Sequence, residues 1–155
     1  VEGVFSNYVI NVNFPCTPKF EETLERELEQ IHRLGLDWYL EPVDYAAEFH
    51  TAYVTRGLYA RELKRWFGYF PREHFLILKS EDFFAHTAAR IADTLRFLGV
   101  DPAAYPPNAS FPTHLPGKYD QPMPPEIRER LREFYRPHNR ELAQLLNWDV
   151  ADWDQ

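Results

Sequence analysis

The stretch from Arg56 to Gly99 constrains the fold most. It contains a helical apolar pattern and a continuous apolar run, separated by residues that break secondary structure. Its first part has a helical pattern, since its apolar side chains fall on one face of a helix. These residues are Leu58, Leu63, Trp66 and Phe67. Gly68 and Pro71 follow directly, and both residue types end helices. The pattern predicts a helix that ends near residue 67.

A short apolar run, HFLIL at residues 74–78, follows those breakers. Such a run is typical of a strand that is buried on both faces, as in a parallel sheet. Residues 80–82, Ser-Glu-Asp, then predict a turn, and residues 87–98 predict a second amphipathic helix that stops at Gly99. The order helix, strand, helix indicates α/β layering.

The chain ahead of this stretch predicts one extended segment and one long helix. Residues 4–14 alternate apolar and polar side chains, which predicts a half-buried strand, with an extended arm (residues 1–15) as the alternative. Thr17-Pro18 is a helix start, and Gly35 is the expected stop. The apolar stripe of this helix is Phe20, Leu24, Leu28 and Ile31, and its Glu/Arg-rich remainder is expected to face solvent. A short helix is expected over residues 45–53.

The chain after this stretch is first proline-rich and then helical. Residues 100–125 hold eight of the thirteen prolines and predict a long loop, of the kind that is functional or docked. A helix is expected from Pro125, with a kink or restart at Pro137. We therefore predict a helix-rich α/β fold with one or two strands, at about 4–14 and 74–78, and about five helices. Residues 1–155 are expected to form a single domain or part of one.

Composition excludes several classes of function. The net charge of −7 argues against binding to nucleic acid or to an anionic membrane, because both need a clustered basic face. No apolar run reaches the roughly 18 residues of a membrane span, so we expect a soluble chain. The single cysteine, Cys16, excludes an intrachain disulfide. The chain begins at Val1, which is expected of a processed, organelle-targeted or partial chain.

Candidate reactive side chains are few. The six histidines are scattered without metal-ligand spacing, so no metal site is predicted. His50 and His114 are weak candidates for a catalytic base, and a surface or capping role is the more common one for such residues. The aromatic cluster Trp66, Phe67, Tyr69 and Phe70 predicts core packing first and the wall of an acceptor pocket second.

Three blocks in order resemble the C-terminal half of sulfotransferases that use 3′-phosphoadenosine 5′-phosphosulfate (PAPS). The blocks are RGLYARELKRWFGYFP, HFLILKSEDFF with the helix ending LRFLGV, and MPPEIRERLREFYRPHNRELAQLL. They extend from Arg56 to Leu146, a little over half of the chain. The resemblance implies a P-loop-like α/β fold with a parallel sheet between helices. It also implies PAPS as cofactor where the complete donor site is present.

The donor-binding part of that family has no match in this sequence. Its N-terminal loop with Lys, Gly and Ser/Thr, which cradles the 5′-phosphosulfate, is absent, as is the Arg and Ser pair for the 3′-phosphate. Gly117 and Lys118, in LPGKY, match the family's late loop over the 3′-phosphate, although a solvent-exposed lysine beside a turn is an equally good interpretation. One lysine in an acidic chain cannot hold a nucleotide with several negative charges.

Two functional hypotheses follow. In the first, the chain is a sulfotransferase-like protein without catalytic activity or cofactor of its own, and it acts as a structural or interaction subunit with other protein chains. In the second, it is the C-terminal part of an active PAPS-dependent sulfotransferase with a hydroxyl acceptor. The aromatic content of 16% favours interfaces in either case.

Overall fold

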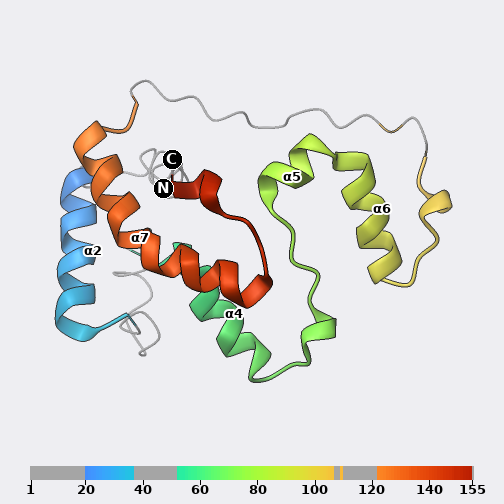
Figure 1. The fold of residues 1–155 in the computed structure, drawn as a ribbon, viewed down its shortest axis with the longest axis horizontal. Helices are drawn as coiled ribbons and strands as arrows, with labels where there is room; N and C mark the ends of the chain where they lie inside the picture. The colour runs from blue at the N-terminus through green and yellow to red at the C-terminus, as the bar shows by residue number, and fades with distance from the viewer. Residues whose placement is uncertain (1–19, 37–51, 107–108, 110–121, 155) are drawn as a thin grey trace, which may run out of the picture. The chain divides into compact units, whose positions relative to one another are not determined.

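The computed structural model describes residues 20–36, 52–106, 109 and 122–154 (Figure 1). These residues contain five α-helices and no strand: α2 (Phe20–Leu34), α4 (Tyr59–Phe67), α5 (Ser80–Ala85), α6 (Thr87–Phe97) and α7 (Pro125–Leu146). They also contain four 3₁₀ turns: η2 (Thr55–Gly57), η3 (Arg72–His74), η4 (Pro102–Ala104) and η5 (Ala151–Asp154). The chain divides into two compact units. The first unit is Val1–Arg65 with Gly117–Gln155, and the second unit is Trp66–Pro116.

Helix α2 follows the predicted apolar stripe. Its acidic first turn, Glu21 and Glu22, lies where the helix dipole favours negative charge. The helix ends at Gly35, whose φ of 85° is a left-handed conformation that costs glycine little. The N–H of Gly35 donates to the carbonyl of Ile31 at 2.9 Å, which satisfies one of the last carbonyls of the helix. The predicted stop is thus confirmed.

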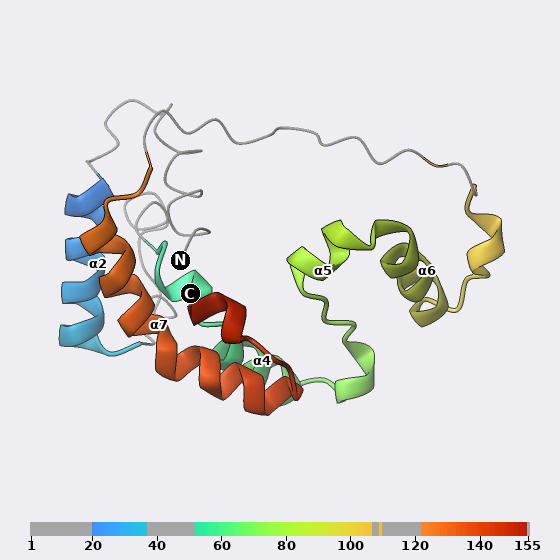
Figure 2. The same cartoon turned by 45° about the horizontal axis from the view of Figure 1, so that its top comes forward.

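Helix α7 is one helix of 22 residues, with Pro137 in its interior. The predicted restart at Pro137 does not occur, although the helix bends along its length in both views (Figures 1 and 2). A proline removes one intrahelical hydrogen bond and crowds the preceding turn, which bends a helix without ending it when both halves are packed. Leu131 and Tyr135 before the proline are buried, and so is Leu142 after it.

The first unit has a hydrophobic core between α2, α7 and the segment that leads into α4. Helices α2 and α7 lie side by side, and α4 lies along the second half of α7 (Figures 1 and 2). The buried core residues are Phe20, Leu24, Tyr53, Val54, Leu58, Met123, Ile127, Leu131 and Tyr135. Two ion pairs bridge the helices at the surface, Glu25–Arg130 and Lys64–Glu141. Their half-exposed side chains limit each pair to about 1 kcal/mol or less.

The second unit differs most from the sequence prediction. The predicted strand at 74–78 is absent from the described structure: η3 ends at His74, and residues 75–79 are assigned to no helix or strand, with Phe75 and Lys79 in the extended conformation. A strand is assigned only where a neighbour supplies ladder hydrogen bonds, and the described residues offer none here. The predicted turn at 80–82 is instead the first turn of α5, whose Glu81 and Asp82 suit a helix N-terminus.

Asp82 links α5 to α6. Its carboxylate lies 2.9 Å from Nδ1 of His86 and 3.2 Å from Nε of Arg90. The acidic residues after the apolar run therefore order the join between two helices, which is a structural role. The predicted segments at 4–14 and 45–53 lie wholly or mostly outside the described residues, and the single-domain prediction stays a prediction.

Candidate functional site

The carboxylate of Glu27 is the most constrained polar group of the described structure. Glu27 lies on the core side of α2 and is 0% exposed. Its Oε2 accepts hydrogen bonds from the backbone N–H groups of Tyr53 and Val54, both at 2.8 Å. Its Oε1 accepts from the N–H and the hydroxyl of Thr55, at 2.8 and 2.9 Å. Four donors from three consecutive residues thus converge on one side chain.

Such a group of consecutive N–H donors is an anion-binding arrangement, comparable in kind to the amides that hold phosphates in other folds. In this chain the anion is the protein's own carboxylate, and all four donors are used. The site is therefore closed to a phosphate or sulfate group. It fixes segment 53–55 to α2, 26 to 28 residues away in the chain.

Burial raises the pKa of Glu27 above its ordinary value of 4.5, and the four donated hydrogen bonds act in the opposite direction. Because every partner is a donor, the ionised carboxylate satisfies the geometry best. A general base must reach a substrate proton, and a fully buried, fully bonded carboxylate cannot. Glu27 is therefore an anchor of the fold.

Tyr135 holds the same segment from α7. Its buried hydroxyl donates to the carbonyl of Val54 at 2.6 Å. Burial, and secondly the charge of Glu27, raises the pKa of Tyr135 far above its usual range, so the phenol stays protonated. The ring also leaves room only for a glycine at residue 57, because a Cβ there would lie 2.6 Å from Oη. Segment 53–57 is thus clamped by an acceptor from α2 and a donor from α7.

A second group of polar side chains joins α4 and α7. His138 packs against the ring of Phe134, with 5.4 Å between the ring centroids. Burial lowers the pKa of His138, and Arg61 lowers it further, while Glu141 opposes them. The hydrogen bond from Lys64 lowers the pKa of Glu141. The group combines an imidazole, two cations and a carboxylate at the surface of the first unit.

We predict that His138 titrates below its ordinary pKa of 6.5 in the folded chain. The unfolded chain then binds more protons between that pKa and 6.5, so His138 removes stability as the pH falls through this window. NMR titration of the His138 ring measures the midpoint directly. Glu141→Gln should lower the midpoint further, because it removes the opposing charge. A midpoint above 6.5 in the wild-type chain would contradict this prediction.

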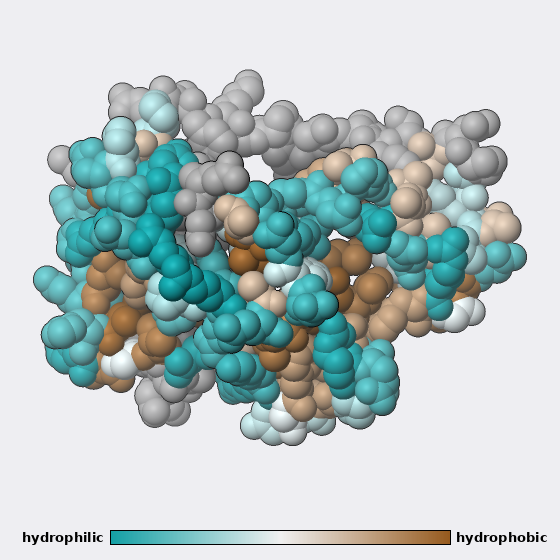
Figure 3. All heavy atoms as spheres, viewed as in Figure 1, coloured by the Kyte–Doolittle hydropathy of each residue, from teal (hydrophilic) through white to brown (hydrophobic). Residues whose placement is uncertain are grey.

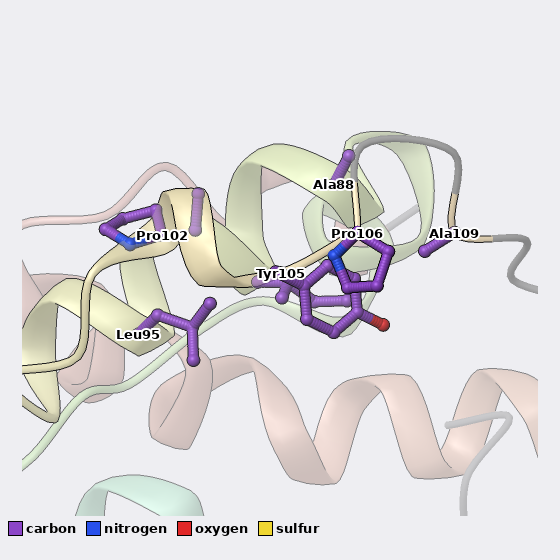
Figure 4. Close-up of a pocket in the computed structure, with 8 residues that line it drawn as sticks. Ala88, Leu95, Pro102, Tyr105, Pro106 and Ala109 are labelled. Carbon is purple, nitrogen blue, oxygen red and sulfur yellow. The ribbon is translucent and has the colours of Figure 1, made fainter.

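The second unit carries an apolar pocket of about 190 Å³ between α6 and the segment that follows it (Figure 4). Tyr105 and Pro106 face α6 across it (Figure 4). The lining residues are Ala88, Ile91, Ala92, Leu95, Pro102, Tyr105, Pro106 and Ala109. None is charged, so the pocket has no group that would hold a nucleotide phosphate. Within the part of the chain that the structure describes, no cluster of three His, Cys, Asp or Glu could hold a metal ion.

Comparison with known proteins identifies the chain's family. The family model for the sulfotransferase domain matches residues 4–111, well over half of the chain. The chain belongs to the sulfotransferase family. Sulfotransferases of this family use PAPS as the sulfuryl donor. No helix among residues 20–36, 52–106 and 122–154 is long and apolar enough to cross a membrane.

Sulfotransferases with related sequences are considerably longer than this chain. Mouse carbohydrate sulfotransferase 15 is 29% identical over 99% of this chain but only 29% of its own length. Mouse heparan sulfate glucosamine 3-O-sulfotransferase 6 is 29% identical over 90% of this chain and 42% of its own length. A crystal structure of a sulfotransferase from Alicyclobacillus acidocaldarius matches 98% of this chain and 53% of that one, at 27% identity and a TM-score of 0.67. The chain thus spans roughly half or less of these sulfotransferases.

The site residues expected of a sulfotransferase lie outside the described structure. This holds for the weak base candidates His50 and His114 and for the phosphate-loop candidates Gly117 and Lys118. Glu27, by contrast, was expected on a solvated face, which is wrong. A signal for its burial exists in the sequence, because Glu27 lies three residues after Leu24 and four before Ile31, on the apolar stripe itself.

Proposed function

We propose that this chain forms the C-terminal part of a sulfotransferase fold. By itself the chain does not bind PAPS, and it acts within a larger assembly. The observation that carries the proposal is the closed anion site at residues 53–55. Converging amides can hold an anion, and the group of three that the described structure contains at residues 53–55 is filled by Glu27. The absence of a Lys, Gly and Ser/Thr loop from the sequence supports the same conclusion.

In this proposal any donor-binding residues belong to a separate chain. The chain then serves as a structural or interaction subunit. Gly117 and Lys118 are its proposed contribution to the 3′-phosphate of PAPS, since a glycine permits close approach and a lysine supplies charge.

A second candidate is an active enzyme of which this chain is the C-terminal part. The relatives' lengths favour it, because the chain spans only 29% to 42% of them. Their names include a carbohydrate sulfotransferase and a heparan sulfate glucosamine sulfotransferase. A carbohydrate hydroxyl is therefore the proposed acceptor, and His50 or His114 the proposed base that would take its proton.

Titration calorimetry of the chain with adenosine 3′,5′-bisphosphate, the donor without its sulfuryl group, tests the proposal. We expect no binding by residues 1–155 at ligand concentrations up to about 1 mM, which corresponds to a binding free energy weaker than about −4 kcal/mol. Micromolar binding that is lost in Lys118→Ala would show a complete donor site in this chain and overturn the proposal. Sulfuryl transfer to a glycan by the chain joined to its upstream polypeptide would favour the second candidate.

A further inference from the structure

The amide groups that bind Glu27 are also held from the side opposite to that carboxylate. The carbonyl of Val54 and the N–H of Thr55 belong to one planar peptide unit, so they point in opposite directions. The Val54 carbonyl accepts hydrogen bonds from the hydroxyl of Tyr135 at 2.6 Å and from the N–H of Gly57 at 3.0 Å. These two bonds direct the Thr55 N–H toward Glu27, and neither of them comes from α2.

The surroundings of the carboxylate are apolar. Leu24, Leu58 and Leu131 belong to the same buried core as residues 53 and 54, and each is at most 2% exposed. Hydrophilic side chains predominate along α7 only on its outer face, which Figure 3 shows. A polar atom inside such a core needs a hydrogen-bond partner within the protein, because its loss of water is otherwise uncompensated. The donors at residues 53–55 provide such partners.

The number of donors fits one class of anion. Each oxygen of Glu27 accepts two hydrogen bonds, at 2.8 to 2.9 Å. A carboxylate is planar, has two oxygens and carries a single negative charge, so four donors satisfy it. A sulfate or phosphate ion has two further oxygens, which would lie in an apolar core without donors. The arrangement therefore suits a carboxylate better than a tetrahedral anion.

We propose that residues 53–55 form a preorganised carboxylate cradle, that Glu27 is its built-in ligand, and that the cradle binds a small free carboxylate when the side chain at residue 27 is shortened. The attachment of α2 to this segment is then a binding interaction between two separately formed parts. This inference goes beyond the proposed function, which requires only that the anion site is filled in the wild type.

Glu27→Ala with acetate tests the proposal. The substitution removes Cγ, Cδ and both carboxylate oxygens, which are the heavy atoms of one acetate ion. Denaturant unfolding of residues 1–155 is compared in sodium acetate and in sodium chloride of equal ionic strength at pH 7. In about 0.3 M acetate the unfolding equilibrium constant should be at least about fivefold lower, which corresponds to half-saturation at about 75 mM or below. Equal unfolding constants in the two salts would overturn the proposal.

The test remains decisive if Glu27→Ala does not fold in chloride. Circular dichroism then follows an acetate titration of the unfolded variant, and a gain of helical signal that saturates is the expected result. A variant that stays unfolded up to about 1 M acetate would show that the cradle does not form without its covalently attached ligand. That result would refute preorganisation.

Glu27→Gly provides a test of fit. This variant lacks Cβ as well, so propionate matches the removed atoms. Acetate should stabilise Glu27→Ala more than propionate does, and propionate should stabilise Glu27→Gly more than acetate does, because an unfilled or overfilled site costs packing. The same order of the two anions in both variants would indicate a general solvent effect and contradict the proposal.

Two controls separate specific binding from the general effect of acetate on protein stability. The wild type already has its ligand, so acetate should act on it no more strongly than chloride does. Leu131→Ala opens a cavity in the same core but supplies no donors. Stabilisation of Leu131→Ala by acetate as large as that of Glu27→Ala would exclude the cradle as the binding site. Sulfate that stabilises Glu27→Ala specifically, beyond its effect on Leu131→Ala, would overturn the preference for carboxylates.

Tyr135→Phe in the Glu27→Ala background tests the preorganisation itself. The Val54 carbonyl loses one of its two donors, so the affinity for acetate should fall by at least about threefold. Unchanged affinity would show that α7 does not shape the cradle. These outcomes are independent of the proposed function, because nucleotide calorimetry on the wild type leaves the cradle filled. Micromolar nucleotide binding there would contradict the proposed function and leave the acetate result standing.

Discussion

Glu27→Ala is expected to lower the free energy of unfolding of the first unit by about 3–5 kcal/mol, or to prevent folding of that unit. The change leaves the N–H groups of residues 53–55 and a buried hydroxyl without their acceptor. It also opens a cavity where the side chain was. Denaturant unfolding followed by circular dichroism measures the loss. Glu29→Ala, at an exposed position of the same helix, should change stability by less than about 0.5 kcal/mol.

Glu27→Gln separates the charge of this side chain from its shape. The amide retains one acceptor oxygen but turns an N–H₂ group toward backbone donors, so a smaller loss than that of alanine is expected. Because the pKa of Glu27 is raised in the folded state, the native chain binds a proton more readily than the unfolded chain. The stability of the wild type relative to Glu27→Gln should therefore increase as the pH falls from 7 toward 4.5.

The opposite pH dependence of the stability difference between the wild type and Glu27→Gln would be equally informative. If the advantage of the wild type grew as the pH rose, the four donated hydrogen bonds would outweigh burial and the pKa of Glu27 would lie below 4.5. Unfolding curves of the wild type and of Glu27→Gln at pH 5 and pH 7 suffice for the comparison. The contributions of all other titrating groups to stability cancel when the two free energies of unfolding are subtracted.

Local signals predicted α2, α4, α6 and α7, whereas α5 forms where a turn was predicted. The stripe from Phe20 to Ile31 and the glycine at residue 35 place α2, and Pro125 places the start of α7. These signals work because the backbone hydrogen bonds of a helix form within one segment of the chain. The local sequence therefore determines both the apolar pattern of the helix and where it ends. Even the interior proline of α7 changed the path of the helix without ending it.

Features that depend on remote partners were not predictable in the same way. The apolar run at 74–78 has the composition of a strand, but its state depends on a neighbour that local sequence does not specify. Burial of Glu27 depends on three amides that lie 26 to 28 residues away. The candidate site residues His50, His114, Gly117 and Lys118 lie outside the described residues and stay predictions. Family membership, by contrast, followed from the order of several weak blocks.

Gly57→Ala is expected to lower the free energy of unfolding by about 1–3 kcal/mol through overpacking against Tyr135. A Cβ at residue 57 would lie 2.6 Å from Oη, 2.8 Å from Cε1 and 2.9 Å from Cζ of that tyrosine. The ring cannot simply move away, because it is buried and its hydroxyl is bonded to the carbonyl of Val54. Thermal or denaturant unfolding measures the loss.

A double-mutant cycle with Tyr135→Phe tests that explanation. Tyr135→Phe alone should cost about 1–1.5 kcal/mol, because the buried carbonyl of Val54 loses its donor. In the double variant the nearest clashing atom is gone and the ring is no longer tethered, so the combined loss should be smaller than the sum by at least about 0.5 kcal/mol. Gly35→Ala is the control: its Cβ would meet nothing within 4 Å, so its cost comes from the left-handed φ and should add independently to that of Tyr135→Phe. Additive losses for residues 57 and 135 would mean that the cost of a side chain at residue 57 does not come from its contact with Tyr135.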